Sequence, residues 1–141
     1  MENSQLSSSD KKLWKRIWWT LFARDRSCAV ALGRPIGINP DDSDVEMVSE
    51  GDFNDNDDDG PSDYPPDPVH VQFFLNYVKL CEIMGLVLSQ QYSVASKMGR
   101  NAMDLTHSDM ALADWLQNCP KEVSWDRQKH HFWAALLYSN Y

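Results

Sequence analysis

The chain has 141 residues, of which 43% are hydrophobic and 24% charged, with a formal net charge of −8 at pH 7. This composition excludes a wholly disordered chain and fits a single globular domain. The three cysteines lie far apart and form no C-x-x-C pair, which argues against a disulfide framework and a zinc site. No apolar run reaches the ~18 to 20 residues that span a bilayer, and residues 1–10 are too polar for a signal peptide. We therefore expect a protein of the cytosol or nucleus, with no membrane partner.

The negative charge is concentrated in one part of the chain. Residues 35–67 carry twelve acidic side chains and no basic one, whereas residues 1–34 carry seven basic and three acidic side chains. Such a segment has little apolar area to offset the conformational entropy lost on ordering. We predict a flexible N-terminus (1–9), a first helix and turn (10–39), an acidic disordered loop (40–68) and the remaining helices of the same domain (69–141). Scattered apolar residues within 36–48 allow local packing at the start of the loop.

The first predicted helix extends from Leu13 to Leu32, with Ser9 or Asp10 as its N-cap. It stops at Gly33 and Pro35, because glycine tolerates a left-handed turn and proline cannot continue the hydrogen-bond ladder. At about 100° per residue, one face holds most of the apolar residues. These are Leu13, Trp14, Ile17, Trp18, Leu21, Phe22, Cys28, Ala29 and Leu32.

Two features break this pattern. Trp19 and Val30 lie among the polar residues on the opposite side, so we expect the helix to bury surface on two sides. Asp25 projects from the middle of the apolar arc, and a buried carboxylate needs a charged or hydrogen-bonding partner. Arg34, just past the end of the helix, is the predicted partner, and a pair that stabilises the fold is favoured over a ligand contact.

The second predicted helix, residues 69–98, is apolar nearly all round, and its polar residues are confined to one narrow arc. Such a helix belongs at the centre of a bundle. Gly85 in its middle costs about 1 kcal/mol relative to alanine, which predicts close packing of a neighbouring helix at that point.

Two further helices follow. Thr106 and Asp109 form a relaxed capping box before an apolar face that ends at Pro120. The last helix is expected from about Trp125, and its apolar pattern is unbroken at the final residue, which predicts truncation; it should bury some of Phe132, Trp133, Leu136, Leu137 and Tyr141. The predicted fold class is therefore all-α: a helical bundle fragment with a long acidic disordered loop between the first and second helices.

The sequence contains only weak signals for a metal site and none for a catalytic site. Asp55, Asp57, Asp59 and Gly60 match the first half of an EF-hand loop, but Pro66 occupies the position of the bidentate glutamate. His130 and His131 diverge on a helix and cannot chelate one ion. No nucleophile elbow, metalloprotease sequence or phosphate-binding glycine loop is present. We expect no enzyme activity, no catalytic or metal residues and no cofactor in this chain.

The first helix is basic, which raises the question of DNA binding. A solvated face is favoured, because the acidic loop follows directly and would compete with DNA for the same positive charges. The basic residues are Lys11, Lys12, Lys15, Arg16, Arg24, Arg26 and Arg34.

The segment from Leu13 to Phe22, then Asp25–Arg26, Ala31–Pro35, Ile38 and Asp44–Val45, resembles the middle homology region of fungal binuclear zinc cluster transcription factors. Residues 69–96 and 104–121 most resemble the cutinase and fatty-acid-responsive regulators of that family. The resemblance implies a nuclear, helical regulatory domain, with zinc and DNA bound by a separate six-cysteine head that is absent here.

This resemblance gives the favoured function: a regulatory region fragment of a fungal zinc-cluster transcription factor that controls target genes, with genes of lipid or cutin metabolism as the expected targets. Its expected partners are the rest of its own regulatory domain, transcriptional co-regulators and a fatty-acid-like ligand held between the first helix and residues 69–98. Architectural roles fall to Trp18, Trp19, Asp25, Arg26, Gly33, Arg34 and Pro35. The alternative is a stand-alone small α-helical module whose acidic loop docks a basic partner.

Overall fold

The computed structural model describes residues 6–54, 65–92, 102–125 and 132–141 of the chain. These contain four α-helices and two short 3-10 helices, and the described part has no strand, so the predicted all-α class is confirmed. In chain order the elements are α1 (Ser8–Leu32), η1 (Pro40–Asp42), η2 (Glu50–Phe53), α2 (Pro68–Tyr92), α3 (Ala102–Gln117) and α4 (Phe132–Tyr138).

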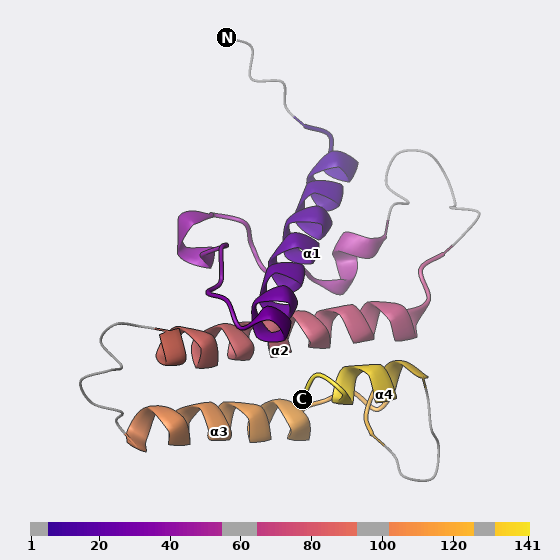
Figure 1. Cartoon of the computed structure of the whole chain (residues 1–141). Helices are drawn as coiled ribbons and strands as arrows, with labels where there is room; N and C mark the ends of the chain where they lie inside the picture. Colours follow the sequence, from indigo (N-terminus) through magenta and orange to yellow (C-terminus); the bar gives the residue numbers. More distant parts are fainter. Residues whose placement is uncertain (1–5, 55–64, 93–101, 126–131) are drawn as a thin grey trace.

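The helices form three levels about α2 (Figure 1). α1 crosses α2 steeply on one side, and its N-terminal half projects away from the rest of the molecule. α3 and α4 lie along the opposite side of α2. The segment between α1 and α2 returns beside α1, where η2 contacts both α1 and α2. α2 therefore has four neighbouring elements: α1, η2, α3 and α4. This is the central position predicted for the second helix.

α1 begins earlier than the sequence pattern indicated. Ser7 is the N-cap, and its hydroxyl accepts the backbone N–H of Asp10 at 3.1 Å, so neither Ser9 nor Asp10 caps the helix. The helix ends where predicted, at Gly33, which adopts the left-handed conformation with φ 61° and ψ 39°. The backbone N–H groups of Gly33 and Arg34 both donate to Ala29 O, which satisfies a carbonyl at the helix end.

The buried face of α1 differs from the predicted one. Phe22 and Ala29 are buried as expected, but Trp19, Ala23 and Arg26 are buried with them on the side that was read as polar. The rest of the helix's large apolar side chains are mostly exposed: Leu13, Trp14, Ile17, Leu21, Val30 and Leu32. The side turned to the core was decided by α2 and by the segment that follows η1, which no periodicity in α1 itself encodes.

The acidic segment is folded over a larger part than expected. Residues 40–54 form η1, η2 and an extended stretch between them, where Val48 is 4% exposed. Val45 and Phe53 pack against the same cluster as Val48. Three apolar anchors and the ion pairs described below therefore order a stretch that was predicted to be disordered. Residues 55–64 lie outside the described part of the chain.

α2 is long and apolar enough to cross a membrane by length and composition alone: Pro68–Gln90 has a mean hydropathy of 1.5, with 33% of the window buried. The prediction that no apolar run is long enough to span a bilayer is therefore wrong on length and composition, although Gln72, Asn76, Lys79 and Glu82 interrupt the run. The same hydropathy is typical of the central helix of a bundle, and α2 contacts three other helices.

A second apolar cluster lies between α2, α3 and α4. Leu80, Trp115, Val123 and Leu137 are buried there, and the Trp115 indole N–H donates to Asn76 O at 3.0 Å. α3 begins at Ala102, so Thr106 lies inside the helix and does not cap it. α4 is shorter than predicted, with Trp125 outside it; Ala134 and Leu137 are its buried residues.

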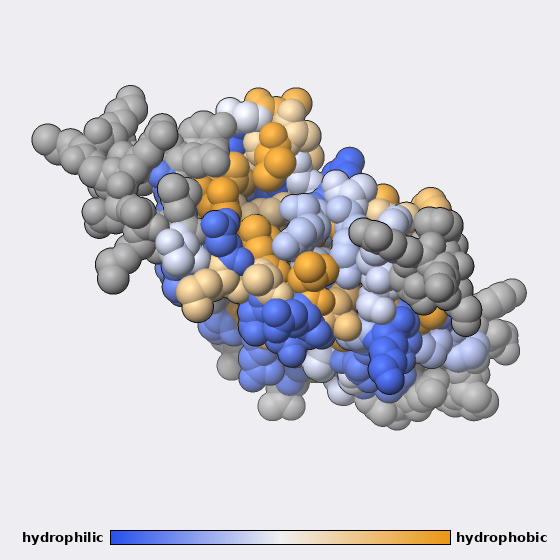
Figure 2. Space-filling model, turned by 90° about the horizontal axis from the view of Figure 1, so that it is seen from below, coloured by the Kyte–Doolittle hydropathy of each residue, from blue (hydrophilic) through white to orange (hydrophobic). Residues whose placement is uncertain are grey.

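The outer surface of α3 and α4 is mixed. Figure 2 shows apolar residues lying among hydrophilic ones on the face seen from this side. The expected burial of some α4 side chains holds for Leu137 alone, since Trp133 is half-buried and the others are open to solvent. The large side chains exposed on or next to these helices are Met110, Trp125, Phe132, Leu136 and Tyr141.

Candidate functional site: the Asp25 corner

Four of the residues that carry the family resemblance meet where α1 ends and the chain turns back: Asp25, Arg26, Arg34 and Ile38. Asp25 Oδ2 accepts the backbone N–H of Gly37 at 2.9 Å and of Ile38 at 3.0 Å. Its Oδ1 lies 3.3 Å from Nη2 of Arg34, the partner that the sequence predicted. The Asp25 side chain is 11% exposed, so these contacts replace most of its hydration. We call this arrangement the Asp25 corner.

Arg26 extends the corner into the core. It is the largest fully buried side chain, 2% exposed, and its Nη1 donates to Ile38 O at 3.0 Å. Its guanidinium carbon lies 3.4 Å from the centroid of the Phe22 ring, and Asp25 Oδ2 is 3.7 Å from Nη1. Burial lowers the pKa of Arg26, and the negative charge of Asp25 opposes that shift. A cation–π contact, one carbonyl and one nearby carboxylate thus offset the desolvation of this charge.

The other side of the Arg26 guanidinium faces a glycine of α2. A Cβ added at Gly85 would stand 3.3 Å from Arg26 Nε, and within the described chain that nitrogen has no hydrogen-bond partner. The close approach predicted at Gly85 is therefore present, and the group that approaches is a flat guanidinium. Its planar shape fits between an aromatic ring and a backbone without a side chain.

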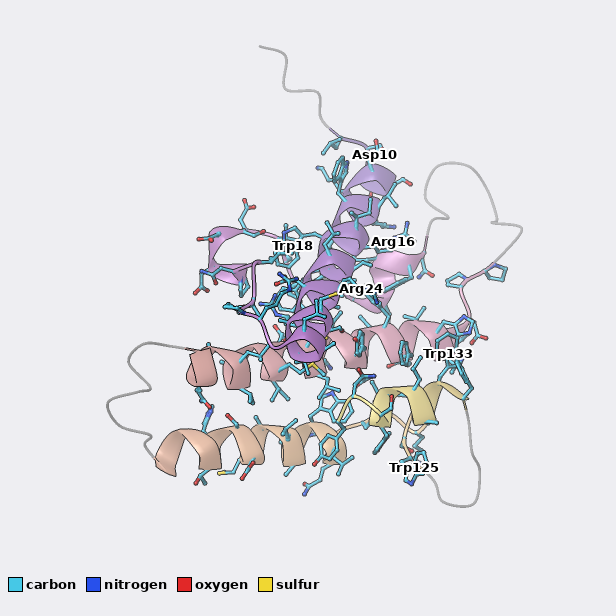
Figure 3. All side chains as sticks on the ribbon, viewed as in Figure 1. Asp10, Arg16, Trp18, Arg24, Trp125 and Trp133 are labelled. Atoms are coloured by element: carbon cyan, nitrogen blue, oxygen red, sulfur yellow. The ribbon has the colours of Figure 1, made fainter. Side chains whose placement is uncertain are left out.

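Trp18 and Trp19 join the corner to the returning segment. The Trp19 indole N–H donates to Glu46 O at 2.8 Å, and Trp19 is 4% exposed. Trp18 is half-buried and stacks on Phe22 with ring centroids 5.5 Å apart. Figure 3 shows Trp18 and Arg16 on opposite sides of α1. Pro35, exposed beyond Gly33, prevents α1 from continuing and so keeps the turn that Asp25 holds.

The basic side of α1 is engaged by the acidic segment. Lys15 Nζ lies 3.1 Å from Asp52 Oδ2 and 3.7 Å from Glu46 Oε2, and Lys12 Nζ donates to Asn54 O at 2.9 Å. The intramolecular pairing expected to compete with DNA is therefore present. Two other basic residues are exposed: Arg24 on α1 and Arg34 at the Asp25 corner.

One pH dependence follows from this pairing. Burial by itself would raise the pKa of Asp52, but hydrogen bonds from the Ser49 backbone, Lys15 and the Ser49 hydroxyl outweigh it and hold the pKa below its usual value of 3.8. A depressed carboxyl pKa contributes stability that is present above pH 3.8 and is lost as the pH falls through the folded-state pKa. We expect urea unfolding to show this loss in the wild type and a shallower acid dependence in Asp52→Asn. The exposed Asp44→Asn is the control; equal acid slopes in Asp52→Asn and wild type would contradict the role of Asp52.

The predicted acyl pocket between α1 and α2 does not match the packing found there. Phe22 is 1% exposed and Val78 and Cys81 are 0% exposed, so side chains fill the contact between these helices. A shallow groove lies instead between η2 and the start of α2. It is lined by Glu50, Phe53, Asn54, Pro66, Pro68, Val71 and Gln72.

Metal and nucleophile chemistry has little support in the described residues. No group of three or more His, Cys, Asp or Glu side chains there is arranged to hold a metal ion. Burial raises the pKa of Cys81 to about 11, so its thiol stays protonated at neutral pH. The half EF-hand at Asp55–Gly60 and the histidine pair at 130–131 lie outside the described residues.

Three residues with contacts in this region were not predicted from the sequence: Gly37, Ser27 and Tyr77. Gly37 lies so close to Asp25 that a Cβ would stand 3.3 Å from Oδ1, and a glycine two residues after a helix-ending proline is a usable signal for such an approach. Ser27 and Tyr77 share a short hydroxyl hydrogen bond between α1 and α2. Nothing in the local pattern of either residue indicates that contact, because they are 50 positions apart.

The chain is similar in sequence to several fungal transcription regulators. The cutinase transcription factor 1 alpha of Fusarium vanettenii is 75% identical over 142 aligned positions, covering 100% of this chain and 16% of the relative. The acetamidase regulatory protein of Aspergillus fumigatus is 24% identical over 139 positions, covering 99% of this chain and 17% of the relative. The cutinase transcription factor 1 beta of Fusarium vanettenii is 45% identical over 51 positions, covering 36% of this chain and 6% of the relative. No solved structure matches the chain.

The chain thus spans about a sixth of the length of the first two relatives. A family model described as the fungal specific transcription factor domain matches residues 2–117, which include α1, the Asp25 corner, α2 and α3. On this match, which covers most of the sequence, the chain belongs to the fungal specific transcription factor domain family.

Proposed function

We propose that this chain is part of the regulatory region of a fungal transcription factor that controls cutinase genes and related genes of lipid or cutin metabolism. The observation that carries the proposal is the 75% identity to cutinase transcription factor 1 alpha along the whole chain. The proposal places the protein in the nucleus and gives the chain itself no catalytic role.

DNA and zinc are assigned to another segment of the longer polypeptide. Two observations support this division. Lys12 and Lys15 are engaged by Asn54 and Asp52, and the three cysteines stand apart in the sequence. In the proposed function, the described helices contribute to the regulation of transcription and do not contact DNA. In this proposal the apolar side chains exposed on α3 and α4, among them Met110, Phe132 and Leu136, pack on the rest of the regulatory domain, and co-regulators bind the assembled domain.

The experiment is done in the intact gene of a fungus that carries it. The variant Gly85→Leu disrupts the contact between α1 and α2, whereas Ser89→Leu adds the same side chain at an exposed position of α2. We expect growth on cutin to induce cutinase transcripts in wild type and Ser89→Leu, and induction to be at least tenfold lower in Gly85→Leu. Immunoblots establish how much of each protein is present.

Two outcomes would contradict the proposal at different levels. If deletion of the gene alters transcripts of amide catabolism and leaves cutinase transcripts unchanged, the assignment to cutin is wrong. If deletion alters no transcript on any carbon source, the transcriptional role itself fails. The proposal also includes a fatty-acid-like ligand, bound elsewhere than in the filled contact between α1 and α2. A long-chain fatty acid should then raise the melting temperature of the full-length protein, and an unchanged melting temperature would remove the ligand from the proposal.

A further inference from the structure

α1 carries an apolar stripe on the side facing away from the core. Leu13 is 47% exposed, Ile17 40% and Leu21 56%, although all three are large aliphatic residues on one face of a regular helix. The other side of α1 is already occupied by α2 and residues 45–54. A stripe of this kind is unfavourable in water, which makes this side of α1 a candidate surface for a second partner.

The stripe has a symmetric arrangement. Asp10, Leu13, Ile17, Leu21 and Arg24 follow one another at spacings of three, four, four and three residues, with Ile17 at the centre. At about 100° per residue, all five fall within an arc of about 80°. Apolar residues occupy the middle, a negative charge lies at one end and a positive charge at the other. Read in reverse, the order of apolar and charged positions is the same and the sign of the charge is inverted.

This symmetry selects an occupant. Two antiparallel copies of α1 related by a twofold axis through Ile17 bring Leu13 of each copy opposite Leu21 of the other. The same arrangement sets Asp10 of each copy opposite Arg24 of the other, which forms two ion pairs. A parallel arrangement would instead oppose like charges at both ends, which is unfavourable. Within the described chain neither Asp10 nor Arg24 forms an ion pair, and both are exposed.

We propose that two copies of the chain associate through α1 as an antiparallel helix pair centred on Ile17. The N-terminal half of α1 projects from the body, with Asp10 near its free end and Arg24 near the crossing with α2 (Figure 3). The projecting half of each copy therefore lies along the lower half of the other. The five positions span about 21 Å at 1.5 Å per residue, so the interface is at the small end of specific interfaces and the dimer is weak.

The test uses charge reversal at both ends of the stripe. Sedimentation velocity of the 141-residue chain between about 5 and 500 μM is compared for wild type, Asp10→Arg and Arg24→Asp, with circular dichroism to establish that each is helical. We expect a concentration-dependent dimer in wild type and at least tenfold weaker self-association in each variant, because each places like charges at both ends. Lys11→Glu, which reverses a neighbouring charge off the stripe, should behave as wild type.

The decisive measurement is the equimolar mixture of Asp10→Arg and Arg24→Asp, with one of them fluorescently labelled. In a mixed antiparallel pair the introduced arginine and the introduced aspartate face each other, and the native pair restores the other end. Mixing should therefore recover wild-type affinity. A wild-type chain that stays monomeric at 500 μM, or variants that do not recover on mixing, would overturn the proposal and leave the stripe to another segment or partner.

Discussion

Replacement of Gly85 by leucine is expected to destabilise the fold by about 3 kcal/mol or more. The new Cβ would stand 3.3 Å from Arg26 Nε, and the guanidinium cannot retreat because its carbon already lies 3.4 Å from the centroid of the Phe22 ring. Overpacking of a filled contact costs about 1 to 3 kcal/mol, and displacement of Arg26 adds the loss of its hydrogen bond to Ile38 O. Since a small domain is stable by only about 5 to 15 kcal/mol, urea unfolding should show a much lower midpoint.

Two matched variants distinguish the loss of the Gly85–Arg26 contact from a general effect of the substitution on α2. Ser89→Leu adds the same side chain at an exposed position of α2 and should change stability by less than about 0.5 kcal/mol. Gly85→Ala sets a gain in helix propensity of about 1 kcal/mol against the tight approach to Arg26, so its net effect should be small. If Gly85→Leu unfolds at the same urea concentration as Ser89→Leu, Arg26 does not occupy the place assigned to it.

The second large effect is expected at Asp25. Asp25→Ala removes the acceptor of the Gly37 and Ile38 backbone N–H groups and the carboxylate that lies 3.7 Å from Arg26 Nη1. Hydrogen bonds to charged groups contribute about 1.5 to 3 kcal/mol, and unpaired groups left buried add to the cost. We expect a loss of about 3 kcal/mol in the free energy of unfolding, together with faster hydrogen exchange at Gly37 and Ile38.

Arg34→Ala is the matched comparison because Arg34 contacts the other oxygen of the same carboxylate. Its side chain is 46% exposed and the contact is 3.3 Å long, so the ion pair should contribute less than about 1 kcal/mol. The double variant Asp25→Ala/Arg34→Ala should be only slightly less stable than Asp25→Ala, because Asp25→Ala already breaks the ion pair that Arg34→Ala removes. Equal losses in the two single variants would show that the ion pair holds the turn and that the backbone bonds do not.

Several features of this protein were determined by local sequence. The helical segments, the stop of α1 at Gly33 and the central place of α2 follow from periodicity, a glycine that accepts a positive φ and a helix apolar on nearly all sides. The pairing of Asp25 with Arg34 was also predictable, because a carboxylate within an apolar arc needs a partner and Arg34 is the nearest cation past the turn. These inferences depend on residues within a few turns of each other.

The helix boundaries were less predictable. Thr106 and Asp109 have the residue types of a capping box, yet both lie inside α3, which begins at Ala102. The same residue types also occur within helices, so the pattern alone does not locate a helix start. Ser7 caps α1 although Ser9 and Asp10 are equally suitable residues. Several acceptable caps in a row leave the start of a helix undetermined by sequence.

Three features depend on tertiary packing: which side of α1 faces the core, which group approaches Gly85 and how far the acidic segment is folded. Trp19 is buried because Glu46 O accepts its N–H and Val48 covers it, contacts that join residues 27 and 29 positions apart. Arg26 is buried because Phe22, Ile38 and Gly85 together replace its hydration. The presence of each α-helix was predictable because it depends on neighbouring residues. The choice between two apolar sides of one helix depends on partners distant in sequence, whose packing energy no local pattern contains.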